Sequence, residues 1–254
     1  MKILRYKADG TSHFGILEGD TVYAATGDVF SGLSKGQEVG KLDDVKLDVP
    51  IQPGKIIAIG LNYLKHVTEN DPTRTVPEEP VVFMKPISSL IAHGENIELP
   101  PGDNTHYEAE LCIVIGKRAK RIKQNEWEDY VLGYTCGNDV SHRDFQAKDG
   151  QWVRAKGFDT FCPLGPVIET EMDANNAPVI SRLNGEIRQN NNTNDLIFGI
   201  PSLMEFITNV MTLEPGDIIM TGTPEGVGAM KPGDTIEIEV GGVGVLKNPV
   251  VARD

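Results

Sequence analysis

The stretch THYEAELCIVIGK, residues 105–117, decides how this chain folds. Its second half, residues 111–115, is a run of apolar residues, which predicts a buried β-strand because such side chains fill the interior of a sheet. Two carboxylates, Glu108 and Glu110, stand at the head of that run. Residues two apart in a strand point to the same face, so both glutamates should project together, on the side opposite Ala109.

Two parallel carboxylates on one face repel each other unless something neutralises them. The stretch alone leaves two interpretations open: a solvated strand end with both glutamates in water, or a site for a hard divalent cation. A third carboxylate nearby would favour the cation site over the solvated strand end. In YTCGNDVSHRDFQ, residues 134–146, Asp139 ends another strand-like run. Glu108, Glu110 and Asp139 would then form a three-carboxylate site.

Strand-like runs dominate the chain on both sides of this stretch. Turn signals such as PPGD, EPGD and KPGD separate several of them. A strong amphipathic helix is predicted at residues 201–211, where apolar residues recur with helical spacing up to Val210 and Met211, and a shorter helix around residues 125–131. The pattern predicts an α+β, β-rich fold. A Rossmann-type fold is not expected, because strands and helices do not alternate regularly and no G-x-G-x-x-G follows a strand. The runs are KIIAIGL, PVVFMKP, ENIELP, VLGYTCGNDVS, DIIMTGTP, DTIEIEV and GVGVLK.

Residues 1–50 are interpreted as a small N-terminal β segment, because ILRY, HFGILE and TVYAA are short alternating runs split by turns. Within it, the polar and weakly patterned residues 31–49 are interpreted as a linker. Residues 51–254 are then the catalytic domain.

Composition excludes several classes of partner. The net charge is −13 and no lysine or arginine cluster stands out, which argues against nucleic acid and against membranes, but not against a small anionic substrate. The three scattered cysteines predict free thiols in a reducing compartment. The first residues lack the apolar region of a signal peptide, and no apolar run approaches the ~20 residues of a spanning helix. A soluble, cytoplasmic protein is expected.

Seven segments, in order along the chain, carry a resemblance that none of them would carry alone. Together they resemble the fumarylacetoacetate hydrolase superfamily over about residues 53–250, and residues 1–50 resemble the small extra segment of many bacterial members. The resemblance implies a mixed β-sandwich or β-roll with few helices around a metal site, commonly as a homodimer. The segments are IGLNYLKH, PVVFMKP, HYEAELCIVIGK, GYTCGNDVSHRDFQ, RAKGFDTFCPLGP, LNGEIRQNNNTNDLIF and MTGTPEGVG.

The resemblance also implies roles for individual residues. It makes Glu108, Glu110 and Asp139 the metal ligands, usually of Mg²⁺, although Mn²⁺ and Ca²⁺ suit the same oxygen donors. It places Lys156, which the sequence alone would leave as a surface lysine, beside the metal. Residues expected to bind substrate are Lys85, Arg143, Gln146, Asp159 and Thr223.

His66 and Glu69 are the residues expected to transfer a proton. On a helix they would share a face, since they are three residues apart. From the residues alone, an exposed turn with a Lys65–Glu69 ion pair is the favoured alternative. In similar members of the family, however, a His-x-x-Glu pair lies on a short lid helix and transfers the proton. The polar, proline-rich residues 70–80 that follow are interpreted as a mobile loop of that lid.

The implied function is that of a Mg²⁺-dependent enzyme acting on a short 2-oxo or enol diacid through a metal-stabilised enolate. The first interpretation is an isomerase or decarboxylase, similar to 2-hydroxyhepta-2,4-diene-1,7-dioate isomerase or to oxaloacetate decarboxylases and tautomerases. A hydrolase that cleaves C–C bonds in acylpyruvates or fumarylacetoacetate is the alternative, and a non-catalytic, metal-dependent binding protein is a third. The sequence does not decide the fate of the enolate.

Overall fold

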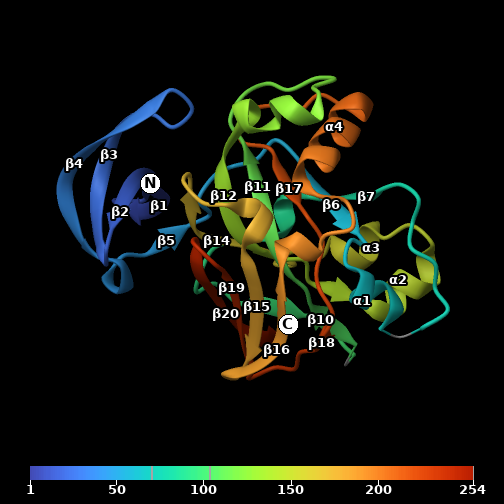
Figure 1. Ribbon diagram of the computed structural model, residues 1–254. Helices are drawn as coiled ribbons and strands as arrows, with labels where there is room; N and C mark the ends of the chain where they lie inside the picture. The colour runs from blue at the N-terminus through green and yellow to red at the C-terminus, as the bar shows by residue number, and fades with distance from the viewer. Residues whose placement is uncertain (70, 103, 254) are drawn as a thin grey trace.

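Sheets are the main structural element of the computed structural model, which describes residues 1–69, 71–102 and 104–253 (Figure 1). Within these residues the largest sheet has twelve strands. Two short strands lie off its main path, β5 (Leu47–Asp48) beside β1 and β8 (Leu90–Ile91) beside β14. The main path runs β4 (Gly32–Lys41), β3 (Thr21–Asp28), β2 (Thr11–Glu18), β1 (Lys2–Ala8), β14 (Cys162–Glu169), β12 (Val131–Asn138), β11 (Ala109–Ile115), β17 (Ile218–Met220), β6 (Ile56–Gly60) and β7 (Val81–Lys85).

Strand β11, at the centre of this sheet, is the buried strand that residues 111–115 predict. It pairs antiparallel with β12 on one side and with β17 on the other. All seven of its residues are buried. Leu111 and Ile113 face one hydrophobic core, whereas Cys112 and Val114 face another on the opposite side of the sheet. A strand buried on both faces explains why its sequence is a continuous apolar run.

A second sheet packs against the first and makes the fold a sandwich. Its strands β15 and β19 contact β11, and β19 and β20 contact β12. Side chains of both sheets, including Ile113, Val179 and Ile238, share one core. In spatial order this sheet contains β16 (Glu186–Asn192), β15 (Pro178–Leu183), β19 (Thr235–Val240), β20 (Gly244–Ala252) and β9 (Ile97–Leu99). A small third sheet contains β13 (Ser141–His142), β10 (Thr105–Tyr107) and β18 (Gly228–Ala229).

Helices are short and few. The predicted amphipathic helix is α4 (Ile200–Val210), which buries Leu203 and Ile207, but Val210, the last residue of the helix, is 67% exposed. The shorter predicted helix is the 3₁₀ helix η3 (Gln124–Tyr130). The other helices are α1 (Leu64–Thr68), α2 (Arg143–Asp149), α3 (Val153–Lys156), η1 (Leu42–Asp44), η2 (Ile87–Ser89), η4 (Ala174–Asn176) and η5 (Thr193–Asp195).

The N-terminal strands continue the large sheet, since β1 pairs with β14. Figure 1 shows β2, β3 and β4 standing away from the rest of the molecule. The interpretation of residues 31–49 as a linker is wrong, because β4 and β5 lie within it. Strand β4 is exposed along most of its length and is held by backbone pairing with β3, so its sequence has no apolar alternation. The domain division at residue 50 stays a prediction.

Two expectations from the sequence concern membrane-spanning helices and the state of the cysteines. Among the described residues, no helix is long and apolar enough to cross a membrane. The three cysteines are free thiols, and all three are buried. Burial raises the pKa of Cys136 and of Cys162 to about 12, so neither thiol has nucleophilic character near neutral pH.

Candidate active site

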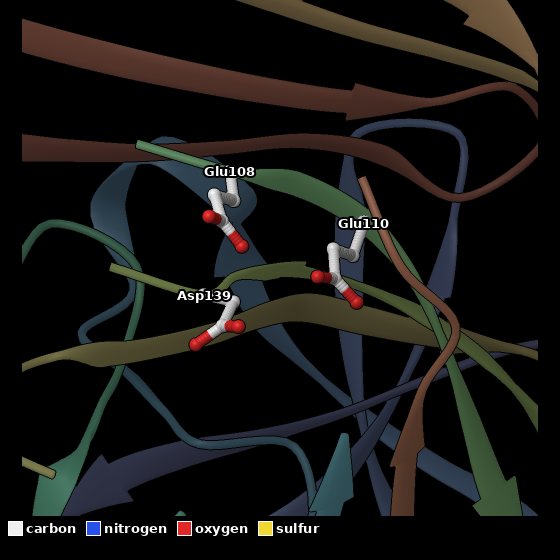
Figure 2. Close-up of side chains that lie close together, drawn as sticks. All are labelled: Glu108, Glu110 and Asp139. Atoms are coloured by element: carbon white, nitrogen blue, oxygen red, sulfur yellow. The ribbon is translucent and has the colours of Figure 1, made fainter. Parts of the chain in front are cut away.

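The ends of β11 and β12 bring three carboxylates together (Figure 2). Glu108 and Glu110 flank the first residue of β11, and Asp139 directly follows the last residue of β12. Ala109 lies opposite Asn138 in the antiparallel pair, so these strand ends meet. One carboxylate oxygen from each of the three acidic residues lies within 4.8 Å of the others. All three side chains are buried.

Backbone hydrogen bonds fix this cluster. The side-chain oxygen of Asn138 accepts from the backbone N–H of Glu108 at 2.9 Å, and the carbonyl of Glu108 accepts from the N–H of Asp139 at 3.0 Å. The N–H of Gly222 donates to Oε2 of Glu110 at 2.7 Å. Gly222 has a φ of +102°, and an added Cβ would lie 2.8 Å from a neighbouring side chain. Only glycine therefore allows this close approach of the TGTPEGVG loop.

Three cations surround the carboxylates. Nζ of Lys156 donates to Oε2 of Glu108 at 2.9 Å and to Oδ2 of Asp139 at 2.5 Å. Nζ of Lys85 donates to Oδ1 of Asp139 at 2.6 Å. The guanidinium of Arg143 lies 2.6 Å from Oε1 of Glu108. In number, these three positive charges balance the three carboxylates.

The balance is uneven at the level of individual groups. Burial works against the charge of Glu108, but Lys156 and Arg143 outweigh it and hold the pKa of that carboxyl well below its usual range. Burial, together with the charges of Asp139 and Glu108, raises the pKa of Glu110 well above its ordinary value. A buried carboxylate in this position needs a proton or a cation to neutralise it. Three buried carboxylates this close together, of which Glu110 pairs with no lysine or arginine of the described residues, fit a hard divalent cation.

His66 and Glu69 meet at the end of α1. Nδ1 of His66 lies 3.2 Å from Oε2 of Glu69, and Oε1 of Glu69 accepts the backbone N–H of Gly226 at 2.8 Å. Burial opposes the charge of Glu69, but these two hydrogen bonds lower its pKa below the ordinary value. Lys65, the alternative partner of Glu69, instead lies 3.5 Å from Glu225. The structure therefore contains the His66–Glu69 contact that the family resemblance implies, and not the Lys65–Glu69 ion pair that the residues alone favour.

Two adjoining cavities connect this pair to the carboxylates. The inner one, of about 30 Å³, is lined by Glu108, Lys156 and Thr223, among others. The outer one, of about 480 Å³, is lined by Glu69 and by residues of the segment that follows α1. Residues lining both cavities are Leu61, His66, Arg143, Gln146 and Trp152.

Comparison with known families identifies one that matches most of the chain. A family profile described as "Fumarylacetoacetate (FAA) hydrolase C-terminal" matches residues 55–251, which include the carboxylates, the lysines and the His66–Glu69 pair. The chain belongs to the fumarylacetoacetate hydrolase family. A second profile, described as "Rv2993c-like, N-terminal", matches residues 1–50.

Solved structures and curated relatives of this fumarylacetoacetate hydrolase family member include named enzymes. A 5-carboxymethyl-2-hydroxymuconate delta-isomerase from Mycobacterium smegmatis is 43% identical, with a TM-score of 0.92 over 100% of both chains. A 2-hydroxyhepta-2,4-diene-1,7-dioate isomerase from Mycobacterium marinum is 38% identical, with a TM-score of 0.91 over 100% of this chain and 99% of that one. The mitochondrial oxaloacetate tautomerase fahd2 of Xenopus laevis is 40% identical over 235 residues, 87% of this chain and 73% of the relative. The predicted family and fold class are thereby confirmed.

The structure does not gather every residue that was expected to bind substrate. Arg143, Gln146 and Thr223 line the inner cavity. Lys85 is fully occupied, since besides Asp139 its Nζ bonds the carbonyl of Lys156 at 2.6 Å and that of Val140 at 3.3 Å. Asp159 is exposed and belongs to the lining of neither cavity. Its expected role in substrate binding therefore finds no support in the position of its side chain.

Two cavity residues, Trp152 and Leu61, were not predicted from the sequence. Trp152 packs edge-on against Phe83, with ring centroids 5.3 Å apart, and an added Cβ at Gly60 would lie 2.7 Å from its ring. Leu61 has a φ of +59°, which is strained for a leucine and is typical of functional sites. Neither residue carries a recognisable chemical pattern. Of these features, only the glycine preceding Leu61 in the GLNY segment gave a signal that could have marked a close approach of the backbone.

Proposed function

We propose that this protein is a Mg²⁺-dependent enzyme that relocates a proton on a short 2-oxo or enol diacid, as an isomerase or tautomerase, with decarboxylation as another fate of the same substrate carbanion. The observation that carries the proposal is the position of the His66–Glu69 pair on cavities that reach the three-carboxylate cluster. A general base beside a cation site is the arrangement that proton removal next to a keto group requires.

Glu108, Glu110 and Asp139 would hold the cation, and Mn²⁺ or Ca²⁺ would suit the same donors. When bound, the cation supplies a Lewis acid toward the keto and carboxylate oxygens of a 2-oxo acid. Lys156, which already bonds Glu108 and Asp139, holds these carboxylates in place and adds positive charge at the inner cavity. Arg143 and Gln146 line that cavity with groups able to bind a substrate carboxylate.

The charges of the inner part of the site favour an anion. Lys85, Lys156 and Arg143 balance the three carboxylates of the cluster, so a divalent cation leaves this inner part with two positive charges, while Glu69 on the outer cavity carries one negative charge. An ionised carboxylate at the reacting end of the substrate matches the positive charge of the inner part. The protein as a whole carries a net charge of −13, so attraction of an anionic substrate has to come from this local region.

His66 is the proposed proton carrier. Glu69 only accepts hydrogen bonds when ionised, so Nδ1 of the neutral imidazole carries the hydrogen and Nε2 keeps a lone pair. Nε2 can then take a proton from the carbon beside the keto group and return it at another position. The ring stays oriented throughout because Glu69 is itself held by the N–H of Gly226.

A panel of 2-oxo acids tests the proposal. The purified protein, with Mg²⁺ or with a chelator, is mixed with each acid, and enol absorbance, released CO₂ and cleaved acids are followed separately. We expect a Mg²⁺-dependent change in enol absorbance, or release of CO₂, with a diacid. Cleaved acids as the main product would instead support the hydrolase. Binding of 2-oxo acids without any turnover would support the non-catalytic alternative.

We also propose that the protein acts as a homodimer. Strand β7 ends the path of the large sheet, and a free strand edge invites pairing with another chain. Helix α3 packs beside β7. Met84 of β7, Ile87 just after it and Val153 of α3 are all exposed, by 43%, 48% and 67%. Light scattering coupled to size exclusion tests this proposal, and a mass of one chain at micromolar concentration would contradict it.

A further inference from the structure

The segment that follows α1 places Arg74 in the lining of the outer cavity. A turn formed by residues 71–74 fixes its backbone. The N–H of Arg74 donates to the carbonyl of Asp71 at 3.0 Å, while Oδ1 of Asp71 accepts from the N–H and the hydroxyl of Thr73 at 2.9 and 2.6 Å. Aspartate followed by proline, as at Asp71 and Pro72, favours such a turn. These hydrogen bonds therefore fix the backbone position from which the Arg74 side chain extends.

The charged groups around the outer cavity are otherwise engaged. Arg143, the other arginine of its lining, is paired with Glu108 and donates to Gln146 at 2.8 Å. Glu69 bonds His66 and the backbone N–H of Gly226. By contrast, Arg74 forms no ion pair within the described ranges; the nearby carboxylate of Asp71, which also lines this cavity and whose charge acts on Arg74, is bonded to Thr73. Its guanidinium is the cation of this cavity that is left for an incoming anion.

The sizes of the two cavities require a long ligand to extend past His66. The inner cavity, at about 30 Å³, has room for about one water-sized group. A diacid with its reacting end at the carboxylate cluster must therefore extend into the outer cavity of about 480 Å³. Arg74 lies on the part of that lining contributed by the segment after α1, whereas Arg143 reaches both cavities.

We propose that Arg74 binds the second carboxylate of the diacid substrate and thereby makes the enzyme prefer diacids to monoacids. This inference rests on the proposed function, to which it adds the residue that binds the end of the substrate farthest from the carboxylate cluster. A guanidinium suits this task because its planar fork binds both oxygens of one carboxylate. Arg74 is exposed, so water weakens the pair, and we expect a preference of about 10-fold rather than several hundred-fold.

Two ligands of equal chain length test the assignment. 2-Oxoglutarate carries a carboxylate at C5 where 2-oxopentanoate carries a methyl group. Calorimetry with the Mg²⁺-loaded protein measures the dissociation constants of both for the wild type, Arg74→Met, Arg74→Lys and Lys65→Met. Lys65→Met is the matched control, because it removes one positive charge from the neighbouring helix at a side chain that is 71% exposed.

We expect Arg74→Met to weaken 2-oxoglutarate binding by about 10-fold, because this diacid has a second carboxylate for the guanidinium to bind. The dissociation constant of 2-oxopentanoate, which lacks that carboxylate, should change by no more than about 2-fold. Arg74→Lys should recover part of the loss, and Lys65→Met should match the wild type. With a turned-over diacid, Arg74→Met should raise KM far more than it lowers kcat. If the wild type prefers the diacid and Arg74→Met keeps that preference, the assignment of Arg74 is overturned. If the wild type binds neither acid, the proposed function fails together with this inference.

Discussion

Nζ of Lys85 donates a hydrogen bond to Oδ1 of Asp139 at 2.6 Å, and both side chains are buried. This lysine therefore supports a carboxylate of the proposed metal site and has no donor left for a substrate. Lys85→Met would leave Asp139 with one buried partner in place of two. Breaking a buried ion pair costs about 3–5 kcal/mol, and we expect the low end, about 3 kcal/mol, because Lys156 still pairs with Asp139. Urea unfolding in the presence of a chelator measures the loss.

Lys247→Met is the control for that measurement. It breaks a surface pair with Glu237, 3.0 Å apart and 54% exposed on the lysine side, which is worth less than about 1 kcal/mol. Equal stabilities of the two variants would show that the Lys85–Asp139 contact does not support the fold.

Glu110→Gln tests the proposed metal site with the least disturbance. The amide keeps an oxygen that can accept the N–H of Gly222, and no lysine or arginine of the described residues loses an ion-pair partner. We expect Mg²⁺ affinity to fall by more than about 100-fold, since even residues that only support metal ligands are worth about 10–100-fold. Calorimetric titration with Mg²⁺ measures this, and the melting temperature of the metal-free protein should be kept or raised.

Asp159→Asn, which removes an exposed carboxylate outside both cavities, is the matched control and should bind Mg²⁺ as the wild type does. Unchanged Mg²⁺ affinity in Glu110→Gln would refute the three-carboxylate site.

The sequence alone predicts those features of the fold that depend on residues close together in the chain. The apolar run of β11 and the spacing of Glu108 and Glu110 are local, and the structure contains the expected strand and carboxylate cluster. Strand β14 was missed because it carries Pro163, Gly165 and Pro166, which read as loop residues. It is nevertheless buried along its whole length, and tertiary packing overrides its weak propensity.

In the candidate site, too, contacts between residues close in sequence were easier to predict than contacts between distant ones. The His66–Glu69 contact depends on one helical turn, so helical spacing allowed it, but the residues alone favoured Lys65 as the partner of Glu69 and only the family resemblance pointed to His66. The attachment of Lys85 to Asp139 joins residues 54 positions apart, so spacing could not reveal it. Trp152 lines both cavities because it packs on Gly60 of β6 and Phe83 of β7, two strands distant from it in the sequence. The polar, proline-rich pattern of residues 70–80 predicted a lid but said nothing of which way Arg74 faces. Asn70 lies outside the described residues.

A pH dependence of stability follows from His93, which lies away from the active site on the lining of another cavity. Burial lowers its pKa below the ordinary value of 6.5, and the charge of Lys247 adds to the effect. Below about pH 6.5 the unfolded chain therefore binds a proton more readily than the folded protein, so stability is lost as the pH falls through the lowered pKa. His93→Gln should lose less stability than the wild type between pH 7.5 and pH 5, as measured by urea unfolding with a chelator present. His13→Gln, which removes an exposed imidazole, should keep the wild-type slope, and identical slopes for all three proteins would contradict the prediction.

The final prediction concerns the proton carrier. His66→Ala should lower kcat on the best substrate by about 10²–10⁴-fold, the usual contribution of general acid–base catalysis. Mg²⁺ affinity should remain, because the proposed ligands lie at the ends of β11 and β12 rather than on α1. The pH–rate profile should also lose the limb that reports the imidazole. Wild-type kcat in His66→Ala would contradict this role and leave a metal-activated water as the better candidate for the base.

Glu69→Gln separates orientation from chemistry. If its amide oxygen keeps the N–H of Gly226, its NH₂ group faces Nδ1 of His66 and donates to it, which favours the tautomer with hydrogen on Nε2. The lone pair that takes the proton is then on the wrong nitrogen. We expect a smaller loss of kcat than in His66→Ala, because the ring is still present and can rearrange. The matched control is Lys65→Met on the same helix, which should keep the wild-type kcat. A Glu69→Gln variant with full kcat and an unchanged pH–rate profile would show that Glu69 does not set the tautomer of His66.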